Sequence, residues 1–256
     1  SLAKDEAKFL EIDFNLSEKA LEMLPDGFPD IKISGSAPAK LYLKFLESKK
    51  VEFDLVSDLK GVELSYLPIG WVKEMNGEAE LKVSGTIGNE FVLNNVYLIS
   101  PSLALVGSAV QQKDENFMFN FEKLALEDVF DIQLVIEKDG VLEVTGGELD
   151  MQEFIKLPLA KNSSKKSTPI TIYLDELKLY EEQVITKFTA ALEASGKGEF
   201  SGSLNDLASF DGVLERVEEG YSIMANSNNA GSFIRALGAA KAADGGTAQL
   251  NLRHLK

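Results

Sequence analysis

The sequence predicts an all-β fold with a few short helices, in which a long antiparallel meander is curled into an elongated groove or an open barrel-like sheet. Three observations predict it. Apolar and polar residues alternate with period two along most of the 256 residues, which is the pattern of strands with one apolar face. Asp139-Gly140 and Gly88-Asn89 each separate two such runs in the manner of a hairpin turn. Helix signals are few.

The alternating runs amount to about fifteen candidate strands, each with one apolar and one polar face. The links between neighbouring runs are short, which favours antiparallel pairing, because a parallel pair needs a crossover of about a dozen residues or more. The clearest runs are Ile12/Phe14/Leu16, Leu41/Leu43/Phe45, Val51/Phe53/Leu55, Leu81/Val83, Phe117/Phe119/Phe121, Ile132/Leu134/Ile136, Ile170/Ile172/Leu174 and Leu250/Leu252.

Three short helices accompany the strands, each with a recognisable start signal. They are a segment 18–24 that Ser17 can cap and Pro25 ends, a turn that Asp150 and Glu153 open before Pro158, and a helix 229–237 in which Asn229 is the N-cap, Phe233 and Leu237 share one face and Gly238 is the C-cap.

The polar, basic stretch 160–169 is the best boundary in the chain. It divides an antiparallel β segment over 1–159 from a second one over 170–256, which carries the helix 229–237. Since strands lie on both sides, the stretch is either a linker or a long loop, and we expect the second segment to continue the first.

Composition excludes several classes of function. The chain has no Cys and one His, His254, so it lacks the residues for a thiolate zinc site, a multi-His metal site or a Ser-His-Asp triad. The formal net charge of −15 disfavours nucleic acid as a partner. We therefore expect no enzyme, no metal and no cofactor, although plentiful carboxylates leave a carboxylate-based hydrolase as a minor alternative.

The width of the predicted sheet carries the functional argument. About fifteen strands at roughly 4.8 Å spacing would span ~70 Å, and twisted open sheets rarely exceed ~10 strands without curling, splitting or closing. Few helices are available to cover the apolar faces. The sheet must therefore fold over itself around a closed core, or curl into a groove with an apolar lining that could hold lipid.

The residues expected to line such a groove are those at the apolar positions of the clearest runs. Phe117, Phe119 and Phe121 form the most apolar strand face, which either packs in a core or contacts acyl chains. The complete predicted lining is Leu41, Leu43, Phe45, Phe53, Leu55, Phe117, Phe119, Phe121, Ile132, Leu134, Ile136, Ile170, Ile172 and Leu174.

The C-terminal part contains a more specific pattern. Residues 220–238 read GYSIMANSNNAGSFIRALG, and residues 244–250 read DGGTAQL. This arrangement resembles the AsmA-like C-terminal region, including the YhdP-type proteins of Gram-negative bacteria, in which a strand leads into a capped helix, a Gly-Gly pair and a new strand. The signature helix corresponds to Asn229, Ala230, Gly231, Phe233, Leu237 and Gly238. Asn229 stands where the family usually has Asp, and both residues are good N-caps.

Weaker elements of the same pattern extend the resemblance over roughly residues 60–256. Residues 67–73 resemble its P-x-G-W-x-K element, residues 144–150 its G-x-x-L-D element, and residues 175–179 and 200–202 later strands of the same region.

The resemblance implies a bacterial envelope protein that acts in the periplasm and in outer-membrane biogenesis. Its parent would be anchored in the inner membrane by a helix outside this segment. A β-groove like that of bridge-like lipid-transfer proteins would carry phospholipid or another acyl lipid toward the outer membrane. The resemblance leaves open whether the protein also contacts other envelope proteins. The alternative from the residues alone is a structural or interaction β-domain with a closed core and no ligand.

Overall fold

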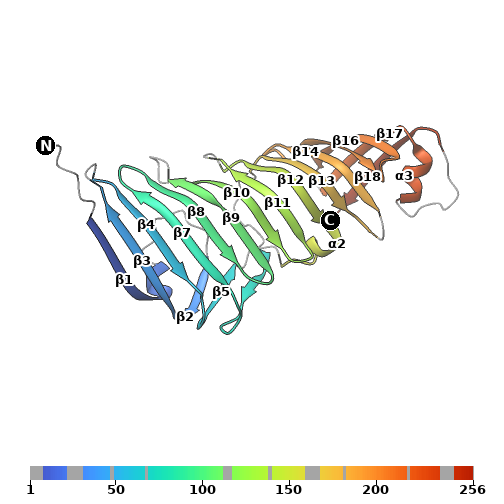
Figure 1. Ribbon diagram of the computed structural model, residues 1–256. Helices are drawn as coiled ribbons and strands as arrows, with labels where there is room; N and C mark the ends of the chain where they lie inside the picture. Colours follow the sequence, from blue (N-terminus) through green and yellow to red (C-terminus); the bar gives the residue numbers. More distant parts are fainter. Residues whose placement is uncertain are drawn as a thin grey trace. The chain divides into compact units, whose positions relative to one another are not determined.

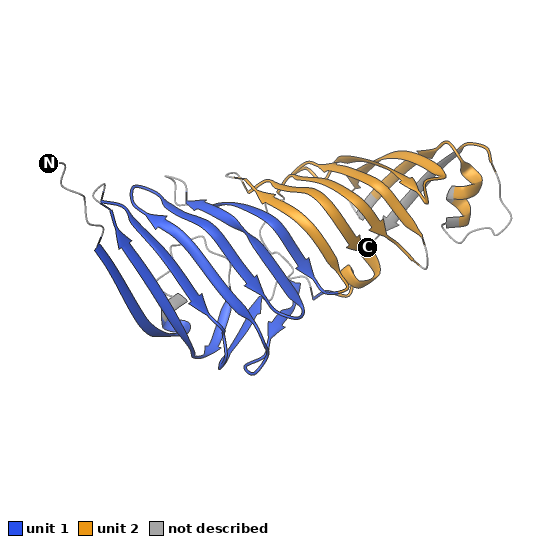
Figure 2. Ribbon diagram, in the orientation of Figure 1, with its two compact units in different colours: residues 1–127, 157–161 blue, residues 128–156, 162–256 orange. Residues whose placement is uncertain are grey.

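The computed structural model describes residues 8–21, 31–46, 49–66, 69–111, 117–137, 140–158, 168–180, 183–217, 220–236 and 245–255. Strands dominate these residues, and the helices among them are short, which confirms the predicted all-β class. The chain forms two compact units (Figure 2). Unit 1 comprises residues 1–127 and 157–161, and unit 2 comprises residues 128–156 and 162–256.

Unit 1 is built on a large antiparallel sheet in which sequence neighbours mostly pair with each other (Figure 1). Its strands, in sheet order, are β1 (Lys8–Leu16), β3 (Ala37–Phe45), β4 (Val51–Ser57), β7 (Glu80–Ile87), β8 (Phe91–Ile99), β9 (Leu103–Gln111) and β10 (Phe117–Leu126). β1 has a single strand neighbour, β3, so the sheet is open at this strand and does not close into a barrel.

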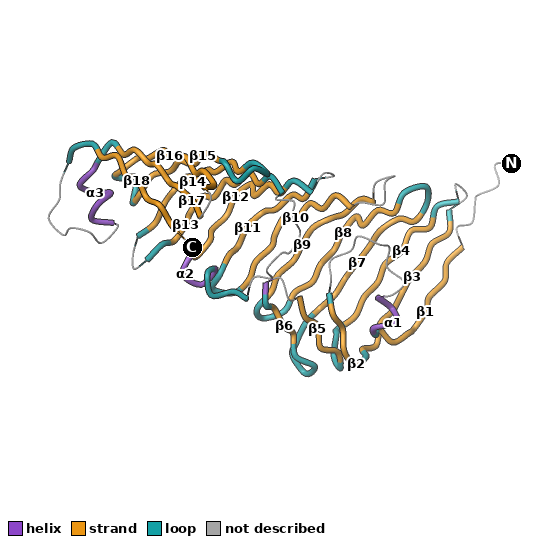
Figure 3. Tube along the Cα trace, turned by 180° about the vertical axis from the view of Figure 1, so that it is seen from behind, coloured by secondary structure: helices purple, strands orange, loops and turns teal. Residues whose placement is uncertain are grey.

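A second, smaller sheet lies at one end of these strands, as the views from both sides show (Figures 1 and 3). It consists of β2 (Lys32–Gly35), β5 (Val62–Tyr66) and β6 (Trp71–Lys73), with the short helix α1 (Glu18–Leu21) contacting β2. Trp71 is 4% exposed, and its Nε1 donates a hydrogen bond to Ser102 Oγ at 3.2 Å in the β8–β9 turn. The small sheet is thereby attached to the large one.

Lys73 fixes the backbone of the small sheet from within. Its side chain is 4% exposed, and its Nζ donates to the carbonyl oxygens of Leu59 at 2.6 Å and Val62 at 2.8 Å. Leu59 and Val62 are the largest fully buried side chains in the described part of the chain. Burial lowers the pKa of Lys73 below its ordinary value, and the charge of Asp58 opposes that shift.

Unit 2 is built on a sheet whose strands follow chain order. They are β11 (Phe130–Ile136), β12 (Leu142–Asp150), β13 (Ile170–Lys178), β14 (Val184–Leu192), β15 (Gly198–Leu204), β16 (Ala208–Val217), β17 (Gly220–Ser227) and β18 (Ala248–Leu255). β18 has one strand neighbour, β17, so this sheet is open as well.

One pairing in unit 2 corrects the expectation of an uninterrupted antiparallel meander. β12 and β13 run parallel, with Leu142 opposite Ile170 and Leu149 opposite Leu177. The connection between them runs over residues 151–169, which is long enough to return the chain to the start of the neighbouring strand. The sheet is therefore mixed.

Two of the predicted helix caps are confirmed. Asp150 Oδ1 accepts hydrogen bonds from the backbone N–H groups of Gln152 at 2.9 Å and Glu153 at 3.2 Å, at the start of α2 (Met151–Phe154). Asn229 Oδ1 accepts from the N–H of Ser232 at 3.1 Å, at the start of α3 (Ala230–Ala236). The predicted helix 18–24 corresponds to α1, and its residues 22–24 lie outside the described residues.

The two units do not follow one another as two continuous stretches of chain. The chain passes from unit 1 to unit 2 between Glu127 and Asp128, in the turn after β10, returns to unit 1 over residues 157–161, and belongs to unit 2 from residue 162 onward. Of the polar stretch 160–169, residues 160–167 lie outside the described residues, so its role as loop or linker stays a prediction.

Candidate functional site

One face of the large sheet in unit 1 is apolar on every strand. Residues directly opposite each other in antiparallel strands share a face, so the register traces a single row across the sheet. That row is Leu10, Leu43, Phe53, Gly85, Leu93, Ala109 and Phe119. We call this surface the apolar face of unit 1.

The structure places all the predicted lining residues of unit 1 on this face. Leu41, Leu43 and Phe45 alternate along β3, opposite Leu55, Phe53 and Val51 of β4. On β10 the ring centroids of Phe117 and Phe119, and those of Phe119 and Phe121, are each 5.7 Å apart.

The sequence pattern missed several residues that complete the face. Phe91 and Leu93 point to the same side as Val96 and Leu98, although the spacing between the two pairs is odd. A bulge at the asparagines 94 and 95 explains this, because an extra residue in one strand restores the apolar face after a break in the alternation. The signal would have been a polar Asn pair between two alternating runs.

Aromatic rings form a continuous run across this face. The Phe53 and Phe91 centroids are 5.9 Å apart in a stacked pair, and the Phe91 and Phe117 centroids are 6.3 Å apart with their planes near perpendicular. Together with the stacked rings of β10, the run crosses from β4 to β10. Such pairs are favourable geometries for aromatic side chains, so this part of the face is held in a defined shape.

Exposure differs sharply between the two ends of the strands. At the end beside the small sheet, which we call the closed rim, the face is buried; its residues include Leu16, Ala37, Ala39, Ser57, Leu98, Leu103 and Leu126. At the opposite end, which we call the open rim, Leu10 is 47%, Phe45 41% and Ile87 46% exposed. The apolar face of unit 1 is therefore covered at the closed rim, whereas at the open rim it is accessible to solvent on β1, β3 and β7 and buried at Phe117 of β10.

On β1, β3, β4 and β7 the opposite face of the sheet carries charged side chains, and several of them form ion pairs. Lys40 contacts Glu11 at 3.0 Å and Asp13 at 3.4 Å, and Lys82 contacts Glu80 at 2.7 Å. The hydrogen bond to Glu11 and the charge of Asp13 raise the pKa of Lys40 above its ordinary value. On these four strands the two faces thus differ, since one is apolar and the other carries paired charges.

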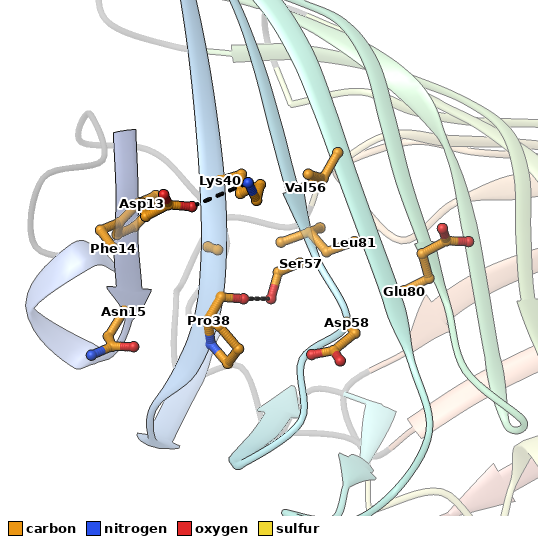
Figure 4. A pocket seen from close by; sticks show the side chains of 11 residues that line it. Asp13, Phe14, Asn15, Pro38, Lys40, Val56, Ser57, Asp58, Glu80 and Leu81 are labelled. Atoms are coloured by element: carbon orange, nitrogen blue, oxygen red, sulfur yellow. Dashed lines mark hydrogen bonds and ion pairs between the residues drawn. The ribbon is translucent and has the colours of Figure 1, made fainter. Parts of the chain in front are cut away.

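A shallow hollow of about 580 Å³ lies near β1, β3, β4 and β7 (Figure 4). Its polar lining includes Asp13, Lys40, Asp58 and Glu80, and Ser57 Oγ in its wall donates to the carbonyl oxygen of Pro38 at 2.8 Å. Lys40 is already neutralised by its own neighbours, so the hollow offers little unsatisfied charge to a ligand.

Unit 2 has an apolar face of its own. Leu174 is buried together with Leu177, Ile185, Leu204, Ala208 and Phe210, and Ile132 and Ile172 pack against this cluster. Leu134 and Ile136 follow Ile132 at every second position of β11, and Ile170 lies opposite Leu192 of β14. The six predicted lining residues of unit 2 therefore also share one face.

The C-terminal signature links the start of α3 to the residues before β18 through backbone hydrogen bonds. The N–H groups of Ala230 and Gly231 donate to the carbonyl oxygens of Gly246 and Gly245, both at 2.9 Å, so the Gly-Gly pair satisfies the first turn of α3. Leu237, Gly238 and the side chain of Phe233 lie outside the described residues. The described part of the signature thus ties a helix start to the strand that follows it.

No cluster of three or more His, Asp or Glu side chains that could hold a metal ion occurs in the described ranges. None of the helices described is long and apolar enough to cross a bilayer.

Comparison with family models, curated proteins and solved structures found no significant match to this chain.

Proposed function

We propose that this chain is a segment of an envelope lipid-transfer protein, and that it holds the acyl chains of a phospholipid against its apolar sheet faces in the periplasm, between the inner and outer membranes. The observation that carries the proposal is the apolar face of unit 1. It is apolar on every strand, and its open rim leaves large side chains such as Phe45 accessible. Each acyl CH₂ buried there would contribute about 0.8 kcal/mol.

Binding of this kind needs no catalytic group. Acyl chains would lie against the aromatic run, and headgroups would stay in solvent beyond the open rim. A long apolar surface without a covering layer is costly for a protein that has no ligand for it, because exposed apolar patches promote association. A net charge of −15 helps to keep such a protein soluble.

The alternative is a structural or interaction domain whose apolar faces are closed. Part of unit 1 favours it: Phe53, Leu93, Ala109 and Phe117 form a buried cluster near the open-rim ends of β4, β8, β9 and β10. On this alternative the exposed side chains at the open rim would be peripheral, and the protein would bind no lipid.

Lipid binding is the decisive experiment. Native mass spectrometry after gentle purification, together with uptake of a fluorescent phospholipid, should show bound lipid. Uptake should fall in Phe119→Asp, which places a carboxylate on the apolar face, and in Leu10→Asp at the open rim. Met118→Asp is the matched control, because Met118 is the neighbouring residue on the other side of β10 and is 38% exposed.

The two readings predict different results for Phe119→Asp. In a closed core an unpaired charge costs several kcal/mol and unfolds a marginally stable domain, whereas on an accessible face the carboxylate reaches water and the fold survives. A wild-type protein that carries no lipid and takes none up would refute the proposal. Leu10→Asp with unchanged uptake would show that the open rim lies outside the lipid path.

A further inference from the structure

The open rim of unit 1 ends in a row of residues whose register is defined strand by strand. Lys8 of β1 lies opposite Phe45 of β3, Phe45 opposite Val51 of β4, and Val51 opposite Ile87 of β7. Lys8 is thus the last residue of the apolar face on β1, two positions beyond Leu10. An ammonium group and exposed apolar side chains share this edge.

Two more lysines lie at the same rim. Lys49 and Lys50 belong to the β3–β4 turn, where the Leu46 N–H donates to the Lys50 carbonyl oxygen at 2.9 Å. The Lys50 side chain passes close to Gly88 in the β7–β8 turn, since a Cβ atom added to Gly88 would lie 3.2 Å from Lys50 Cγ. Lys8, Lys49 and Lys50 are all exposed.

These three lysines differ from the others on the large sheet. Lys40, Lys44 and Lys82 each contact a carboxylate within 3.0 Å. Among the described residues, no carboxylate lies within ion-pair distance of Lys8, Lys49 or Lys50. In a chain with a net charge of −15, three ammonium groups that lie beside an apolar edge, with no described carboxylate within ion-pair distance, stand out as a local reversal of charge.

The described acidic groups near the rim are few. Glu90 is exposed in the β7–β8 turn, and Glu52 on β4 is engaged with Lys44 at 2.8 Å. Glu47 lies outside the described residues. The described part of the rim therefore has more positive than negative side chains.

We infer that the open rim of unit 1 binds the phosphate of a lipid headgroup, with Lys8, Lys49 and Lys50 as its ligands and the acyl chains on the apolar face. The inference rests on the proposed function and adds to it the residues that hold the phosphate. Charge complementarity selects the occupant: ammonium groups attract a phosphate, and the adjoining side chains of Leu10, Phe45 and Ile87 attract the chains attached to it. A soluble anion would use only the first of these contacts.

The test compares two labelled lipids with the same acyl chains, phosphatidylglycerol and diacylglycerol, which lacks the phosphate. Wild-type protein should bind phosphatidylglycerol at least about fivefold more tightly, and added salt should weaken the preference. The triple variant Lys8→Gln, Lys49→Gln, Lys50→Gln should lose the preference while its affinity for diacylglycerol stays unchanged.

The control variant carries the same change in net charge elsewhere: Lys19→Gln, Lys32→Gln and Lys187→Gln, on α1, β2 and β14. It should keep the preference. Equal binding of the two lipids by wild-type protein would overturn the headgroup assignment and leave the proposed function standing. Binding of neither lipid would overturn both. Competition by inorganic phosphate as strong as that by phosphatidylglycerol would show a general anion site and refute the lipid assignment.

Discussion

Phe53 of β4 lies directly opposite Gly85 of β7, and a Cβ atom on Gly85 would come within 2.8 Å of the Phe53 ring. The same relation recurs between Phe121 and Gly107. It recurs again in unit 2, between Phe200 and Gly212. In each case the missing side chain lets a phenylalanine ring lie over the backbone of the adjacent strand. Because these rings pack flat against the sheet, the apolar faces stay continuous where a larger residue would interrupt them.

Gly85→Ala should therefore destabilise unit 1 by about 1–3 kcal/mol, because the added methyl group meets both the Phe53 ring and the backbone of Val92. Urea denaturation would measure the change. Gly88→Ala is the control, since its methyl group would meet only the flexible side chain of Lys50. Equal stability of Gly85→Ala and wild type would mean that the ring does not rest on the glycine.

Lys73→Met should cost about 1–3 kcal/mol, because it leaves the buried carbonyl oxygens of Leu59 and Val62 without the ammonium that they accept from. Lys60→Met, in the adjoining turn, removes an exposed ion pair with Asp58 and should change stability by less than about 1 kcal/mol. Thermal melting of both variants checks the contrast. A Lys73→Met protein as stable as wild type would show that Lys73 does not support the small sheet.

Stability should also depend on pH through Lys73. Its pKa is lower in the folded protein than in the unfolded chain, so between these two values the unfolded state binds more protons. The stability of the wild type relative to Lys73→Met should therefore rise as the pH increases from neutral toward the ordinary lysine pKa of 10.5. Using the variant as reference cancels the titration of exposed lysines such as Lys40. A difference that falls over this range would reverse the assigned shift.

The cap of α3 provides a conservative pair of variants. Asn229→Ala should cost about 1 kcal/mol, because it removes the acceptor for the Ser232 N–H. Asn229→Asp keeps an acceptor at the same place and should leave stability nearly unchanged. Chemical denaturation followed by circular dichroism would test both, and a loss in Asn229→Asp equal to that in Asn229→Ala would contradict the capping role.

Much of the strand pattern could be predicted because it is local. Phe117, Phe119 and Phe121 lie on one face simply because successive residues of a strand alternate sides, and the caps at Asp150 and Asn229 depend on residues within one turn of helix. The bulge at asparagines 94 and 95 could not be predicted in this way, since a bulge is defined by the register of the partner strand. The parallel pairing of β12 with β13 likewise depends on where a long connection returns.

The small sheet could not be predicted from the sequence either. Its strands are too short for a period to be read, and Lys73 looks like a surface residue until three backbone carbonyls surround it. A lysine is rarely buried unless partners are available, and here two of those partners, the carbonyl oxygens of Leu59 and Val62, come from a segment that only the fold brings to it.

Leu10 and Leu16 show most clearly what the sequence alone determines and what the tertiary structure determines. Both are leucines on the same face of β1, and the alternation of the sequence alone determined that they share it. Leu16 is 8% exposed and Leu10 is 47% exposed. Only the tertiary structure decided this difference, because burial depends on what covers a side chain, and the small sheet covers one end of the strands and leaves the other end open.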